Sequence, residues 1–188
     1  MSVAPDHDDW GPLASLPGNP MIWLLILSEL MVFGIGLIGF VVARDLDPAG
    51  FAHAQDSLNR FAGAINTLVL MTSGLFAALA VEARTRSKIA LSRRWIAAAI
   101  LFGIIFLVIK GFEYADKVVH GTAGLNVNFI TLYFLLTGFH AAHVILGIII
   151  LIIVGWKNTL ENLETGAAFW HMIDLIWVIL FPVVYLMR

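Results

Sequence analysis

The residues of this sequence with the clearest capacity for chemistry are ionisable side chains within long apolar segments. Carboxyl and imidazole groups exchange protons, and imidazole also ligates metals and haem iron. Such groups are rare in apolar segments that could enter a membrane, so each is a candidate functional residue. They are Glu29, Lys110, Glu113, His140, His143, His171 and Asp174.

Glu29 is the one charged residue of the first apolar segment. It stands about 12 Å from the start of that segment if each helical residue rises 1.5 Å. An isolated carboxylate is costly at that depth, so we expect Glu29 to bind a proton. Two roles stay open: a proton-exchanging or regulatory carboxyl, and a protonated side chain that hydrogen-bonds between helices.

His171 and Asp174 are three positions apart, so on a helix they share a face and can pair. We expect this pair chiefly to lock two helices together. By the same helical rise Asp174 lies roughly 10 Å from one end of its helix, close to the depth of Glu29. The two carboxyls could therefore belong to one buried polar layer.

His140 and His143 also share a helical face, which raises the question of a metal or haem site. Structural zinc needs three or four converging ligands. Axial histidines in a bundle come from different helices, so neighbours three apart cannot ligate one iron from both sides. We expect no metal here, and instead hydrogen bonds from these imidazoles to Glu113, Tyr114 or Asp174.

Lys110 and Glu113 are three positions apart near the end of an apolar segment, with Tyr114 beside them. This spacing predicts an intrahelical ion pair. We expect the pair to lie at the membrane surface, with the Lys110 ammonium extended toward water.

The composition identifies the elements that must position these groups. The chain has 188 residues, of which 60% are apolar and 13% charged. Average soluble domains are about 45–50% apolar and 25% charged, so the sequence indicates a membrane protein. The absence of cysteine excludes disulfides and thiolate metal sites. No basic stripe, phosphate-binding loop, nucleophile elbow or catalytic triad is present, so we expect neither a nucleic-acid partner, nor catalytic residues, nor a soluble small-molecule substrate.

Five apolar segments are long enough to span a bilayer as helices. We predict an all-α, polytopic bundle of five transmembrane helices in one domain, residues 21–188, after a polar tail of residues 1–20. The predicted helices cover about residues 21–43, 61–83, 95–119, 128–155 and 167–187.

Counts of Lys and Arg in the loops predict the orientation. Eleven such residues divide six to five between the two sides, but five of the six lie in one short loop, residues 84–94. We therefore predict a cytoplasmic N-terminus and a periplasmic C-terminus. Small residues at helical spacing predict close helix packing, within the chain or against a larger partner. They are Gly34, Gly36, Gly39, Gly63, Thr67, Gly74 and Ala78.

Five stretches, taken together and in order, resemble the subunit III family of haem–copper oxidases, in a short form without the first two of the usual seven helices. They are Ser28–Phe33 (SELMVF), Asn66-Thr67 with Ser73-Gly74, Glu113-Tyr114, Thr137–Val144 (TGFHAAHV) and Trp170–Trp177 (WHMIDLIW). Two further stretches look most like the NorE-type branch associated with nitric oxide reductase. They are Lys110–Tyr114 (KGFEY) and Leu180–Leu186 (LFPVVYL).

The resemblance implies a multi-pass subunit of the bacterial inner membrane that binds no metal or haem itself. Its partner would be a catalytic subunit containing haem, with copper or non-haem iron, and it would support assembly, stability and proton uptake there. Glu29 matches the family carboxyl that reacts with carbodiimide. The resemblance also implies structural phospholipid, although the absent helices form one wall of the family's lipid cleft. Two alternatives stay open: a stand-alone haem-binding electron-transfer protein and a small proton-coupled transporter.

Overall fold

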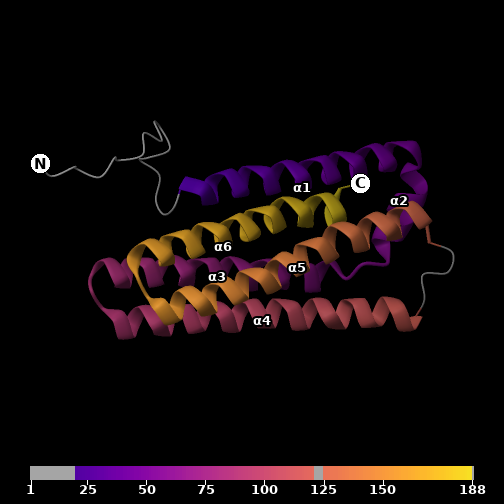
Figure 1. The fold of residues 1–188 in the computed structure, drawn as a ribbon. Helices are drawn as coiled ribbons and strands as arrows, with labels where there is room; N and C mark the ends of the chain where they lie inside the picture. Colours follow the sequence, from indigo (N-terminus) through magenta and orange to yellow (C-terminus); the bar gives the residue numbers. More distant parts are fainter. Residues whose placement is uncertain (1–19, 121–124, 188) are drawn as a thin grey trace, which may run out of the picture.

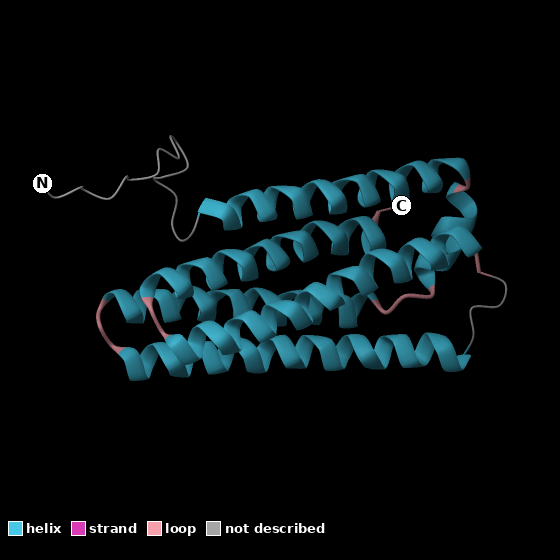
Figure 2. Cartoon of the chain, viewed as in Figure 1, coloured by secondary structure: helices cyan, strands magenta, loops and turns pink. Residues whose placement is uncertain are grey.

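The computed structural model describes residues 20–120 and 125–187, and within these ranges the chain is helical without strands (Figures 1 and 2). Apart from Pro20, the predicted N-terminal tail lies outside the described residues. The elements are α1 (Pro20–Leu46), α2 (Pro48–Asp56), α3 (Arg60–Thr85), α4 (Ile89–His120), α5 (Val127–Lys157), α6 (Leu160–Phe181) and η2 (Pro182–Leu186), a π-helical turn.

Among the described residues, five helices are long and apolar enough to cross a membrane. They are Met21–Leu46, Arg60–Thr85, Ile89–Val119, Val127–Lys157 and Leu160–Leu186. The predicted all-α architecture with five candidate spans is therefore confirmed. The side of the membrane on which each end lies stays a prediction.

The starts of two predicted helices are wrong, and one short helix is missing from the prediction. Helix α4 begins at Ile89 rather than at residue 95. The last helix begins at Leu160 rather than at residue 167, since the Thr159 hydroxyl accepts a bond from the Asn162 amide at 3.3 Å. The short helix α2 was not predicted. Asp47 caps it by accepting a bond from the Gly50 amide at 3.0 Å, and Pro48 occupies its first turn.

The helices α3 and α4 form an antiparallel hairpin, α6 packs between α3 and α5, and α5 also packs on α4 (Figure 1). Helix α1 lies at the edge of the bundle, against α5 and α6. Its outer face exposes large apolar side chains every three or four residues. They are Leu24, Leu27, Met31, Ile35, Ile38 and Val42. A stripe of this kind suits contact with lipid or with another membrane helix.

Only some of the predicted small residues allow close packing within the chain. A Cβ atom added to Gly36 would lie 2.7 Å from Leu136 Cδ2, and one added to Gly63 would lie 2.7 Å from Phe181 Cε2. Gly34 and Gly39 have no such neighbour within 4 Å. Within the chain, only Gly36 of α1 lies close against α5, and packing of Gly34 and Gly39 against a larger partner stays a prediction.

Helix α3 also accepts hydrogen bonds from α6. Trp177 Nε1 donates to Thr67 Oγ1 at 3.0 Å, and Trp170 Nε1 donates to Ser73 Oγ at 3.2 Å. Ser73 in turn donates to the Ala99 carbonyl of α4 at 2.6 Å. Small polar residues thus satisfy the indole N–H groups in the interior of the bundle.

Candidate functional site

Glu29 of α1 lies against His143 of α5, with Glu29 Oε2 3.1 Å from His143 Nε2. The side chains are 25% and 11% exposed, so the pair sits at the edge of the bundle rather than in its centre. Phe33 and Phe139 pack against the imidazole ring. The only charged residue of the first apolar segment therefore has an imidazole partner within the membrane-spanning region.

The backbone determines which nitrogen of His143 carries a proton. His143 Nδ1 is 2.8 Å from the Phe139 carbonyl oxygen, which can only accept, so Nδ1 is protonated. Nε2 then faces the Glu29 carboxyl. The pair can exist as a neutral acid beside a neutral imidazole, or as a carboxylate beside an imidazolium. The two groups lie at ion-pair distance but are not aligned as a hydrogen bond, since Glu29 Oε2 has no hydrogen-bond partner among the described residues.

His140 lies one helical turn from His143 but has a different environment. It is fully buried, its ring packs against Phe106 and Trp177, and neither ring nitrogen has a hydrogen-bond partner among the described residues. The predicted hydrogen bonds from the two histidines to Glu113, Tyr114 or Asp174 are therefore wrong. The orientation of α5 about its axis places the His143 imidazole against α1 and the His140 imidazole among aromatic side chains of the core.

A second polar cluster surrounds Lys110 in the interior. Lys110 Nζ lies 3.1 Å from Glu113 Oε2, and it donates to Tyr133 Oη at 3.0 Å and to Tyr185 Oη at 2.5 Å. Both tyrosine hydroxyls donate to Glu113 Oε1, at 2.7 Å from Tyr133 and 2.6 Å from Tyr185. Four side chains from α4, α5 and η2 thus form a closed hydrogen-bonded ring.

The predicted Lys110–Glu113 pair is present, but the predicted extension of the Lys110 ammonium toward water is wrong. Its side chain is 2% exposed and that of Glu113 is 8% exposed. The ammonium does not extend to water because three acceptors and the faces of three tyrosine rings surround it inside the bundle. The third ring belongs to Tyr114, whose hydroxyl bonds to Thr137 Oγ1 at 2.6 Å.

Sequence reasoning missed Tyr133 and Tyr185 as members of this cluster. The chain has three tyrosines, all in predicted spans, and of these only Tyr114 stands beside the predicted ion pair in the sequence. A lysine within an apolar helix needs several acceptors, so the rarity of tyrosine here was a usable signal. The spacing of residues along the sequence does not indicate which helices pack together around Lys110.

His171 and Asp174 pair as predicted, with His171 Nδ1 3.5 Å from Asp174 Oδ2. A side chain at Gly74 of α3 would overlap the Asp174 carboxyl, so this glycine makes room for it. Asp174 thus faces α3 while Glu29 faces α5, and no described contact joins the two carboxyls. The geometry gives no support to one shared polar layer.

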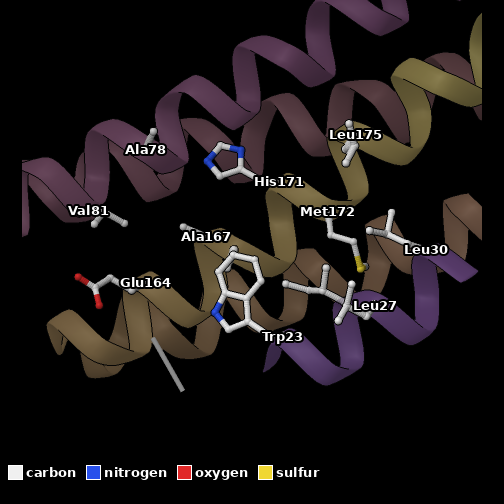
Figure 3. A pocket seen from close by; sticks show the side chains of 12 residues that line it. Trp23, Leu27, Leu30, Ala78, Val81, Glu164, Ala167, His171, Met172 and Leu175 are labelled. Atoms are coloured by element: carbon white, nitrogen blue, oxygen red, sulfur yellow. The ribbon is translucent and has the colours of Figure 1, made fainter. Parts of the chain in front are cut away.

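A groove of about 540 Å³ lies between α1, α3 and α6 (Figure 3). Its walls are largely apolar, and include Trp23, Leu30 and Met172, with His171 and Glu164 as the ionisable members. Ala78, which was predicted to pack closely, is exposed on this groove. Among residues 20–120 and 125–187, no three His, Asp or Glu side chains converge to hold a metal ion.

Comparison with known proteins identifies the family. The model of the cytochrome c oxidase subunit III family matches residues 21–188. A probable cytochrome c oxidase subunit 3 of Mycobacterium leprae is 30% identical over 176 residues, which cover 89% of this chain and 86% of the relative. The cytochrome c oxidase subunit 3 of Corynebacterium diphtheriae is 28% identical, covering 88% and 86%. That of Synechocystis is 27% identical, covering 87% and 73%.

These relatives and the five apolar helices identify a multi-pass bacterial membrane protein. Members of the matched family are accessory subunits of haem–copper oxidases, without catalytic metal centres of their own. The family model covers all five spans and the ionisable residues described above. The chain belongs to the cytochrome c oxidase subunit III family.

Proposed function

We propose that this chain packs in the membrane against the haem-containing catalytic subunit of a respiratory oxidase and supports that subunit's assembly, stability and proton uptake. Membership of the subunit III family supports the partnership. The exposed apolar stripe of α1 and the open sides of Gly34 and Gly39 offer a surface on which another helix can lie closely.

The Glu29–His143 pair is the observation that carries the proton-related part of this proposal. Its atoms are 3.1 Å apart, and a quarter of the Glu29 side chain is exposed at the edge of the bundle. A carboxyl and an imidazole at this distance are close enough to exchange a proton once the side chains turn into hydrogen-bond alignment, and the partly exposed Glu29 side chain could meet a neighbouring subunit at the edge of the bundle. By contrast, the described hydrogen bonds of the Lys110 cluster are all made within the chain.

The terminal electron acceptor is proposed to be oxygen, because the relatives described above are subunits of cytochrome c oxidases. Nitric oxide is the alternative acceptor, on the strength of the NorE-type resemblance of residues 110–114 and 180–186. Purification of the chain from its native membranes tests both. Haem and metal analysis of the chain that co-purifies distinguishes an oxidase from a nitric oxide reductase, and purification without any haem protein would refute the partnership.

The proton-related role is tested with Glu29→Gln, which keeps the size of the side chain and removes its acidic proton. We expect the complex to assemble normally but to turn over more slowly or to inactivate sooner during turnover. His143→Phe should have the same effect, because it removes the proton acceptor. Glu82→Gln is the matched control, since this carboxyl is exposed and pairs with Arg86 at the end of α3. Unchanged activity and lifetime of the complex in both test variants would refute the proton-related role and leave Glu29 with a role in packing only.

We also propose that the groove between α1, α3 and α6 holds an acyl chain of a structural phospholipid. Its apolar walls and volume of about 540 Å³ support this assignment. The groove is formed by α1, α3 and α6 of this chain.

A further inference from the structure

A second groove lies on a different side of the bundle, between the first turns of α4 and the last turns of α5. Its volume is about 350 Å³. Ile96, Ala97 and Ile152 line its floor and walls, and Arg93 and Trp156 complete its lining at the helix ends. The groove shares no helix with the one between α1, α3 and α6. It is an open apolar groove with the Arg93 guanidinium at one end.

Arg93 has donor capacity that the chain leaves unused. Its Nη2 donates a long bond of 3.4 Å to the Trp156 carbonyl oxygen at the end of α5. A guanidinium carries five N–H donors in a planar fork that matches phosphate oxygens. Arg93 is exposed, and no carboxylate forms a described ion pair with it. An external anion is therefore the partner best suited to this side chain.

The surroundings of Arg93 are also positive. This end of the bundle holds six Lys and Arg side chains, at positions 84, 86, 88, 93, 94 and 157, against three Glu, at positions 82, 161 and 164. Arg84 Nε donates to the Asn158 carbonyl at 2.7 Å, which holds the basic loop between α3 and α4 against the end of α5. The folded chain thus gathers positive charge at the opening of the groove.

Trp156 indicates the level of the membrane surface. Its side chain is among the most exposed of the large apolar residues, and the residue as a whole is 84% exposed. Tryptophan is enriched at the boundary between lipid and water. From this we infer that Arg93 lies at headgroup level, and Ile96, Ala97 and Ile152 at the level of acyl chains.

We propose that the groove between α4 and α5 binds one anionic phospholipid, with its phosphate at Arg93 and an acyl chain along Ala97 and Ile152. The positive charge at the opening favours a headgroup with net negative charge over a zwitterionic one. This site is independent of the accessory role proposed above, because it depends only on the chain being in a membrane.

The test measures the lipid retained by the full-length chain in its native complex. The purified complex is exchanged into vesicles of phosphatidylglycerol or of phosphatidylcholine, extracted with a mild detergent, and examined by native mass spectrometry. Arg93→Gln removes the guanidinium. Ala97→Trp fills the groove without changing charge, from an exposed position that does not disturb the core. Arg94→Gln is the matched control, since it removes the same charge from an exposed neighbour that does not line the groove.

We expect the unaltered complex and Arg94→Gln to retain one more phosphatidylglycerol per chain than either Arg93→Gln or Ala97→Trp. Phosphatidylcholine should not be retained at this site by any variant. Equal retention of phosphatidylglycerol by all four proteins would overturn the proposal. Retention of phosphatidylcholine as strong as that of phosphatidylglycerol would also overturn it, because the groove would then select only for an alkyl chain.

Discussion

Replacement of Glu113 by Gln tests whether the cluster around Lys110 is an ion pair on which the fold depends. Lys110 is 2% exposed, so its ammonium cannot reach water when the carboxylate is removed. Breaking a buried pair from one side costs about 3–5 kcal/mol of unfolding free energy, because the remaining charge is left uncompensated. The two tyrosine hydroxyls also lose their anionic acceptor, which is part of the same cost.

The double variant separates this effect from a general loss of packing. Lys110→Met alone leaves the Glu113 carboxylate buried without its cation, so it should also destabilise the protein. In Lys110→Met with Glu113→Gln no charge remains, and both tyrosines can donate to the Gln amide oxygen. The double variant should therefore lose about 2–3 kcal/mol less unfolding free energy than the sum of the losses in the two single variants, as is found for residues in direct contact.

The assay is reversible unfolding in mixed micelles with increasing sodium dodecyl sulfate, followed by far-ultraviolet circular dichroism. The free energy of unfolding is compared for the unaltered chain, both single variants and the double variant. Losses that add to within about 0.5 kcal/mol would show that the two residues do not interact, and would refute the ring described here. So would a loss below about 1 kcal/mol in Glu113→Gln.

Two further predictions use the same assay. Gly147→Ala should lower the free energy of unfolding by about 1–3 kcal/mol, because its Cβ would lie 2.6 Å from Ile173 Cδ1. Gly111→Ala is its control: no atom lies within 4 Å of the added Cβ, so this variant should be neutral or more stable, and equal losses would contradict the packing described. Gln55→Leu removes the bond of 2.9 Å from Gln55 Nε2 to the Val184 carbonyl, at a cost of about 1–3 kcal/mol. Amide hydrogen exchange in η2 should become faster, and unchanged exchange there would show that this bond does not hold the C-terminal turn.

Local features of the sequence predicted much of the architecture. Apolar segments of about 20 residues predict spanning helices because an unpaired backbone is too costly in lipid. Spacing within one helix was equally informative: His171 pairs with Asp174, and Lys110 pairs with Glu113, as residues three apart should. The helix ends were less predictable, because capping by Thr159 extends α6 well before its apolar part.

The partners that come from different helices were decided only by the tertiary structure. Glu29 meets His143, although no spacing connects two residues so far apart in the chain. Tyr133 and Tyr185 converge on Lys110 from α5 and η2.

The sequence by itself determined that the chain crosses the membrane as helices, and which ionisable groups enter with them. Whether each group finds a carboxyl, a hydroxyl or an aromatic ring depends on how far each helix is rotated and shifted against its neighbours. Those rotations are set by the close fit of side chains such as Leu136 against Gly36, and helical periodicity alone does not contain that information.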